Sequence, residues 1–300
     1  MESLRSVSFD IPAAAVPEAP EPSESREVKP DGLYRAYCWG RGPHAKADAE
    51  GMPASFCVSS FQVRLRPDSS ASLVLAGELH RCGIEPILQV TCRDRNRVAL
   101  QSDLLGAAAL GIENLLVLSG DHSRFGDHPD ARPVFDLDSV QLLEVAAGLM
   151  HGTDMAGRPL AGTPRFFPGA AVNPAAEPFE LVVQKLRKKV QSGARFLQTQ
   201  AVFTRAELER LCAVTAPLGI PVLAGVLLVR SAGMARFLNA NIPGMAVPES
   251  VLRRLEQASD PFAEGVALAR ETVGWARGLC QGVHLMTLGH EERIPQILET

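Results

Sequence analysis

The sequence predicts an α/β protein with a (β/α)8 TIM barrel, a single domain with an irregular N-terminal segment. Short apolar runs alternate with amphipathic stretches from about residue 53 onward, and eight strand candidates can be found over 300 residues. Several predicted helices also end at a glycine just before the next strand. A Rossmann-type sheet is the alternative, but its GxGxxG motif does not follow the first strand candidate.

The first 52 residues are predicted to form an irregular arm that includes a candidate first barrel strand at 6–11. Residues 13–32 are rich in proline and acidic residues, a composition that buries too little apolar surface to order itself. The barrel is expected over residues 53–300.

The remaining strand candidates follow in chain order and are separated by helical patterns. The strands are expected at 55–63, 86–91, 114–118, 166–172, 196–200, 221–226 and 283–288. Helices are expected at 95–111, 136–150, 179–193 and 260–279. The glycines that fit a positive φ just after a helix are Gly83, Gly111, Gly193 and Gly219.

Composition and charge exclude several classes of protein. The formal net charge is −4, so no global basic field attracts nucleic acid or an anionic membrane. No run of eighteen apolar residues occurs and the N-terminus is acidic, so a cytoplasmic protein is expected. The six cysteines are scattered without metal-ligand spacing, which predicts reduced thiols and no metal site.

The stretch "LLVLSGD" places a carboxylate at the end of a buried strand, where barrel enzymes keep their active sites. Asp121 can accept a hydrogen bond from a heterocycle or place negative charge beside a cofactor, and Gly120 lets a flat ring approach the backbone. The alternative is a Gly-Asp turn in which Asp121 caps the next element.

Two further patterns carry polar groups, and each has a structural alternative. The basic run from Lys185 to Lys189 suits a phosphate site, but an isolated charge run is more often a solvated helix face. Gln198 and Gln200 alternate on one strand face and require a polar ligand or an interior hydrogen-bond network if they are buried.

Specific motifs resemble the methylenetetrahydrofolate reductase family, most closely its acetogen-type branch. The motifs cover about residues 70–300 and include "LQVTCRDRNR", "VLSGD", "FDLDSVQLL", "LRKKVQSGARFLQTQAVF", "VRSAGMARFLN" and "VHLMTLGHE". The resemblance implies a flavin-containing barrel that reduces 5,10-methylenetetrahydrofolate to 5-methyltetrahydrofolate in one-carbon metabolism. It implies FAD as cofactor, NADH or NADPH as electron donor and a folate substrate.

The resemblance also assigns roles to individual residues. Asp121 matches the aspartate that tunes the flavin, and Gln200 the glutamine that binds the pterin, with Phe203 in the same motif. His290 stands at a substrate-binding position where the family has an arginine. Contacts to the flavin ribityl, pyrophosphate and adenine groups are implied for Thr91, Gly120, Asn173, Lys188 and Lys189.

The N-terminal region departs from the family pattern. Asp10 stands where the family has its glutamate acid, and residues 13–70 lack the usual first helix and second-strand motif. Divergence, a displaced reading frame and a completing partner protein are three explanations. Ala232 replaces an aromatic residue of many members, which argues against simple direct use of NADH.

These departures leave a second function open. The alternative is a non-catalytic flavin- or folate-binding subunit of a methyl-transfer complex. A homo-oligomer or a redox or methyl-transfer partner subunit is compatible with either function.

Overall fold

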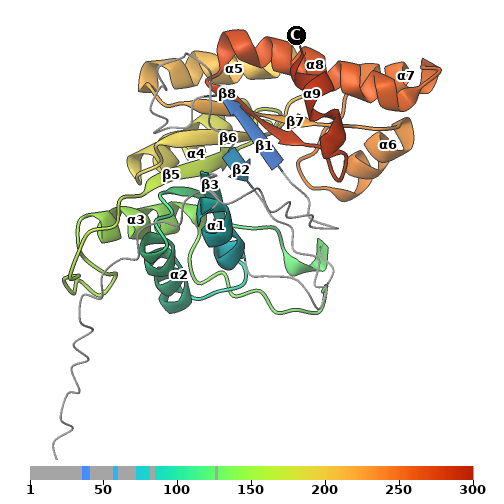
Figure 1. Ribbon diagram of the computed structural model, residues 1–300. Helices are drawn as coiled ribbons and strands as arrows, with labels where there is room; N and C mark the ends of the chain where they lie inside the picture. The colour runs from blue at the N-terminus through green and yellow to red at the C-terminus, as the bar shows by residue number, and fades with distance from the viewer. Residues whose placement is uncertain (1–35, 41–56, 60–71, 82–84, 126–127, 300) are drawn as a thin grey trace, which may run out of the picture. The chain divides into compact units, whose positions relative to one another are not determined.

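Six parallel strands in chain order form the curled sheet of the protein (Figure 1). The computed structural model describes residues 36–40, 57–59, 72–81, 85–125 and 128–299, all within the unit Leu33–Thr300. The six strands are β3 (Pro86–Thr91), β4 (Asn114–Leu118), β5 (Phe167–Val172), β6 (Phe196–Ala201), β7 (Val222–Leu227) and β8 (Gly282–Met286). Each of them begins and ends within two residues of its predicted bounds.

Two short strands stand between β8 and β3 in the strand order. They are β1 (Ala36–Gly40) and β2 (Cys57–Ser59). The strand β2 pairs parallel with β3, whereas β1 pairs antiparallel with both β2 and β8, and these pairings close the strand order into a ring. No strand was predicted at 36–40, and the antiparallel pairing of β1 departs from the expected barrel of parallel strands. The predicted strand 6–11 and most of the predicted arm lie outside the described residues.

Helices follow the parallel strands and cover the outer face of the sheet. They are α1 (Ser72–Arg81), α2 (Arg97–Ala109), α3 (Ser139–Met150), α4 (Phe179–Gln191), α5 (Arg205–Thr215), α6 (Ala232–Asn241), α7 (Glu249–Gln257), α8 (Pro261–Leu279) and α9 (Ile294–Leu298). Capping boxes begin α3, with Asp138 and Gln141, and α5, with Thr204 and Glu207. The predicted positive φ is confirmed at Gly111, Gly193 and Gly219, while Gly83 is outside the described residues.

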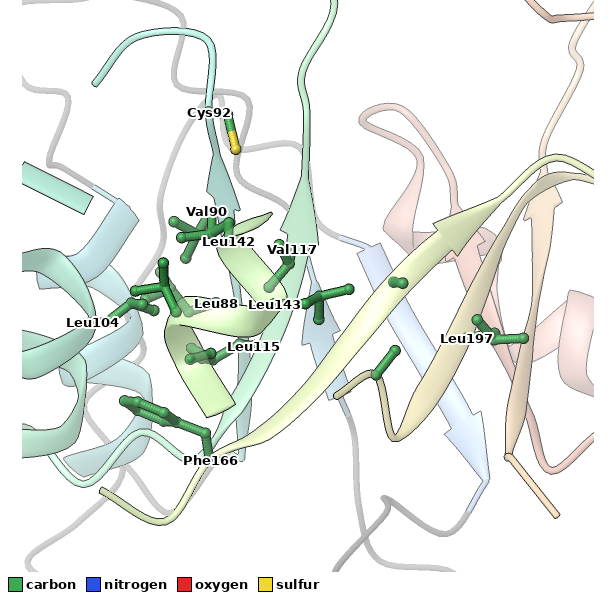
Figure 2. Packing of buried hydrophobic residues seen from close by; sticks show 14 of the residues in the cluster. Leu88, Val90, Cys92, Leu104, Leu115, Val117, Leu142, Leu143, Phe166 and Leu197 are labelled. Atoms are coloured by element: carbon green, nitrogen blue, oxygen red, sulfur yellow. The ribbon is translucent and has the colours of Figure 1, made fainter. Parts of the chain in front are cut away.

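The sheet has one face toward the helices and one toward its own interior. Figure 2 shows the outer core, where Leu88 of β3 and Leu115 of β4 pack with Leu142 and Leu143 of α3. A separate cluster fills the interior and consists of Ile87, Leu116, Phe167, Phe196 and Leu223. This division follows the alternation of side chains along each strand.

Aromatic packing closes the interior near the beginning of β5 and β6. The rings of Phe167 and Phe196 stack with their centroids 5.8 Å apart. A Cβ atom at Gly169 would lie only 2.1 Å from the Phe196 ring, so glycine is required there. These apolar side chains fill the interior near the beginning of the strands. Polar side chains are therefore expected at later positions of the strands.

Candidate active site

The ends of β3 and β4 are joined by Arg93. Its guanidinium donates to both carboxylate oxygens of Asp94, at 2.7 and 2.9 Å, and to the backbone oxygen of Asp121 at 3.3 Å. The hydrogen bonds from Arg93 hold the pKa of the Asp94 carboxyl below its usual value. Thr91, the last residue of β3, donates to the same carboxylate at 3.5 Å.

Gly120 lies against Arg93 and Thr91 in a backbone conformation that only glycine adopts readily. Its φ is +84°, and a Cβ atom would lie 3.1 Å from Cβ of Arg93 and 3.3 Å from Cβ of Thr91. The backbone at the end of β4 is therefore packed tightly against the end of β3, and only glycine fits there.

Asp121 carries an exposed carboxylate that is not engaged as a cap. Within the described residues its side chain makes no hydrogen bond or ion pair. The following 3-10 helix, Ser123–Phe125, is instead capped by His122, whose Nδ1 accepts from the Arg124 N–H at 3.2 Å. The capping alternative for Asp121 is thus not what the structure shows, and the negative charge remains available to a ligand.

The two lysines of the basic run lie in different environments. Lys188 is exposed, whereas Lys189 is half-buried and donates from Nζ to the backbone oxygen of Ala171 in β5, at 2.7 Å. Burial, followed by repulsion from Lys185, lowers the pKa of the Lys189 ammonium. The solvated-face description therefore suits Lys188 but not Lys189, which is turned toward the sheet.

Asn173 follows β5 and ties it to a distant loop. Its Nδ2 donates to the backbone oxygen of Gly244 at 2.8 Å, and its Oδ1 accepts from the Ala175 N–H at 3.0 Å. The amide retains one further N–H and one lone pair for a ligand.

Gln198 and Gln200 differ in burial although both belong to β6. Gln198 is 5% exposed and Gln200 is exposed, and the pairing with β7 shifts register between Gln198 and Ala201. The Thr199 hydroxyl supports this irregularity, since it accepts from the Gly225 N–H at 2.8 Å and donates to the Gln200 backbone oxygen. Phe203, after the strand, is half-buried.

His284 is an interior residue that the sequence analysis missed. It pairs with Gly225 of β7, which lies two residues after Leu223 of the interior cluster, so its imidazole points into the ring of strands. The side chain is buried, and neither ring nitrogen finds a partner in the described part of the chain. Burial lowers its pKa to about 4, so the imidazole is neutral at pH 7.

The oxygen Oε1 of Gln198 is also buried without a partner. Two unpartnered polar side chains inside one ring of strands indicate a place for a polar ligand or water. The signal for His284 was present in "VHLMTL", where a histidine stands in an apolar strand, but on its own it reads as a core residue.

His290 and Arg230 meet above the ends of β8 and β7. The Arg230 guanidinium donates to Nε2 of His290 at 2.8 Å, which leaves the proton of a neutral imidazole on Nδ1, 3.3 Å from a Glu292 carboxylate oxygen. The Phe262 ring lies edge-on to the imidazole at 5.0 Å. Arg230 itself is exposed and has no carboxylate partner among the described residues.

The site residues thus form separate groups around one edge of the sheet. Thr91, Gly120 and Asp121 lie together through Arg93, whereas no hydrogen bond joins Asp121 to Gln200 in the described residues. Asp10 lies outside the described residues. No cluster of His, Cys, Asp or Glu suited to a metal ion occurs in the part of the chain that was described.

A sequence model of a known protein family matches most of the described chain. The sequence model of the family described as methylenetetrahydrofolate reductase matches residues 65–300. The chain belongs to the methylenetetrahydrofolate reductase family. The match begins before α1 and includes every site residue named above except Asp10.

Individual members of the methylenetetrahydrofolate reductase family share about a quarter of their aligned residues with this chain. A Caenorhabditis elegans protein named "Probable methylenetetrahydrofolate reductase (NADPH)" is 24% identical over 240 residues, which cover 77% of this chain and 34% of that protein. "Methylenetetrahydrofolate reductase 2" of Schizosaccharomyces pombe is 25% identical over 235 residues, or 72% of this chain and 35% of that protein. The chain spans about a third of the length of both relatives.

A protein of known structure with low sequence identity has a similar fold. It is described as an uncharacterized protein from Clostridium thermocellum that binds two copies of 5-methyl-5,6,7,8-tetrahydrofolic acid. The TM-score is 0.53 at 12% identity, over 80% of this chain and 79% of that chain. No helix in the described residues is long and apolar enough to cross a membrane.

Proposed function

We propose that this protein reduces 5,10-methylenetetrahydrofolate to 5-methyltetrahydrofolate in the cytoplasm, with FAD as cofactor and NADH or NADPH as electron donor. The observation that carries the proposal is the exposed carboxylate of Asp121 at the end of β4, which makes no hydrogen bond or ion pair in the described residues. Membership of the family supplies the reaction class. We further infer that the fold is a variant of the (β/α)8 barrel in which β1 takes the first position in reverse direction.

The residues at the strand ends fit a flavin. Gly120 permits the backbone conformation that places Asp121 at the end of β4, and the Asp121 carboxylate makes no hydrogen bond or ion pair in the described chain. We assign the polar flavin chain to Thr91 and Asn173, and the phosphates to Lys188 and Lys189. When bound, the flavin supplies hydride transfer to the folate.

The remaining site residues are assigned to the folate. Gln200 and Phe203 would bind and orient the pterin, and Asp10 is our candidate for the acid that protonates the folate nitrogen. We place the glutamate carboxylate of folate at Arg230 and His290, where an exposed guanidinium has no carboxylate partner in the described residues. A guanidinium pairs with a carboxylate in two parallel hydrogen bonds.

An absorption spectrum followed by anaerobic addition of 5-methyltetrahydrofolate tests the proposed function. We expect a flavin band near ~450 nm that bleaches on addition of the folate. A retained flavin that does not bleach, even with a supplied redox partner, would favour the alternative function as a non-catalytic subunit. Two differences from the family pattern favour that alternative. Asp10 is a shorter acid than the family's glutamate, and Ala232 stands in place of an aromatic residue.

Replacing Lys189 should release flavin. Lys189→Met keeps the apolar stem and removes the ammonium, so the fraction of protein that retains flavin after gel filtration should fall at least about twofold. The control is Lys185→Met, because Lys185 is exposed in the same helix. Equal flavin content in both variants would mean that Lys189 does not hold the flavin and only donates its hydrogen bond to Ala171.

Replacing Arg230 should weaken folate binding without slowing chemistry. Loss of one charge-assisted hydrogen-bond pair in Arg230→Gln should raise the KM for the folate about tenfold, or about 1.4 kcal/mol, with kcat within about twofold. Steady-state kinetics measure both constants. Arg253→Gln, an exposed arginine paired only with Glu249 in the described residues, should leave both unchanged. A fall in kcat with unchanged KM would contradict the assignment.

A further inference from the structure

Two thiols far apart in the sequence lie in contact on the outer side of the sheet. Cys212 belongs to α5 and Cys280 ends α8, two residues before β8 begins. Their Sγ atoms are 3.7 Å apart and both thiols are free. A disulfide bond measures about 2.0 Å, so roughly 1.7 Å of approach would close one.

The surroundings of the pair differ from those of Cys92. Both sulfur-bearing residues are half-buried, so a small reagent can reach them. Cys92 is completely buried, and burial, followed by the charge of Asp138, raises the pKa of its thiol to about 11. Because Cys92 is fully buried and the thiolate is the reactive form, Cys92 is not open to a reagent in solution.

The contact affects the two thiols differently. The hydrogen bond between them lowers the pKa of Cys212, and the same contact together with burial raises the pKa of Cys280. At neutral pH Cys212 therefore has more thiolate than Cys280. The Cys280 thiol already lies within reach of an oxidised Cys212 sulfur.

We propose that Cys212 and Cys280 form an oxidative modification site that converts hydrogen peroxide to water and becomes a disulfide between α5 and the end of α8. The Cys212 thiolate attacks one peroxide oxygen, the O–O bond breaks and hydroxide leaves, which takes up the proton lost by Cys212. The Cys280 sulfur then attacks the sulfenic sulfur of Cys212, and the S–O bond breaks with release of a second water. Two thiols are oxidised and one peroxide is reduced to two waters.

The cross-link would join the two ends of a long chain segment. The residues between Cys212 and Cys280 include all of β7, α6, α7 and α8. Closing so long a loop removes conformations from the unfolded chain and stabilises the folded state. The Gln281 side chain already accepts from the Val222 N–H at 2.9 Å beside this point, so the beginnings of β7 and β8 are held in register. Oxidation would add a covalent bond to an ordered junction.

Peptide mapping of the full-length protein after peroxide treatment tests the proposal. The reduced protein is given about one equivalent of hydrogen peroxide, its remaining thiols are alkylated, and it is digested without reductant. We expect a peptide pair linked through Cys212 and Cys280 with the loss of two hydrogens, reversed by dithiothreitol. Cys92→Ser should retain the cross-link, whereas Cys212→Ser and Cys280→Ser should lose it.

Thermal unfolding gives a second readout. The oxidised parent should melt about 5 °C or more above the reduced parent, and the two cysteine variants should show no such difference. The proposal is overturned if Cys212 is oxidised to the sulfinic acid without a cross-link, if another cysteine takes part instead, or if the melting shift persists in Cys212→Ser. Peptide mapping needs only the parent protein, so a variant that fails to fold does not remove the test.

Discussion

Asp121→Asn should lower the rate of flavin reduction by 5-methyltetrahydrofolate at least about tenfold, which corresponds to about 1.4 kcal/mol of transition-state stabilisation. The substitution keeps the size of the side chain, removes its charge and replaces one acceptor oxygen by an NH2 donor. Asp121 is exposed and unpaired in the described chain, so no ion pair is broken and the fold should remain intact. Stopped-flow absorbance at the flavin band measures the rate, and a thermal melt checks the fold.

The matched control for Asp121→Asn is Asp130→Asn. Asp130 is also exposed and has no hydrogen bond or ion pair of its side chain in the described residues, and it lies in the same connection between β4 and α3. A general change in surface charge would slow both variants equally. An unchanged rate in Asp121→Asn, or an equal loss in Asp130→Asn, would remove Asp121 from the mechanism.

The parallel strands could be predicted because their residues carry local signals. Continuous apolar runs such as 115–118 are bounded by glycine and polar residues, and these runs match a sheet buried on both faces. The glycines before β4, β6 and β7 could be predicted because a positive φ favours glycine over every other residue. Such features depend on a few neighbouring residues.

The features that escaped prediction depend on contacts between distant segments. The antiparallel β1 is defined by its pairing with β8, more than two hundred residues further along the chain. The Lys189 ammonium is turned inward by an oxygen of Ala171, and the Asn173 amide is held by Gly244. A charge run or a lone amide looks the same in the sequence whether such a partner exists or not.

The candidate site was partly predictable for the same reason. Strand ends could be located from the sequence, so Asp121 and Gly120 were found at the end of β4. Whether Asp121 acts as a cap could be decided only by the structure, in which His122 caps the following turn. His284 was missed because its importance comes from having no partner inside the ring of strands, a property that no local pattern records.

The unpartnered His284 should make the protein less stable in mild acid. The imidazole pKa is 6.5 in the unfolded chain and about 4 in the folded protein, because burial disfavours the charged ring. Between these values the unfolded state binds more protons than the folded state, so stability is greatest above about pH 6.5 and falls as the pH decreases toward 4. The loss from this residue should reach about 3 kcal/mol at pH 4.

Chemical unfolding of the parent and of His284→Gln at several pH values between 4 and 7 measures this loss. Glutamine does not titrate, so the difference in unfolding free energy between the two proteins should shrink or change sign as the pH falls. His128→Gln provides the control, because His128 is exposed and its replacement should leave the pH dependence unchanged. Asp136, whose pKa is lowered to about 2 by its hydrogen bonds with Arg97, titrates below this range and is common to all three proteins. A parallel pH dependence in parent and His284→Gln would mean that water or a bound ligand already satisfies the imidazole in solution.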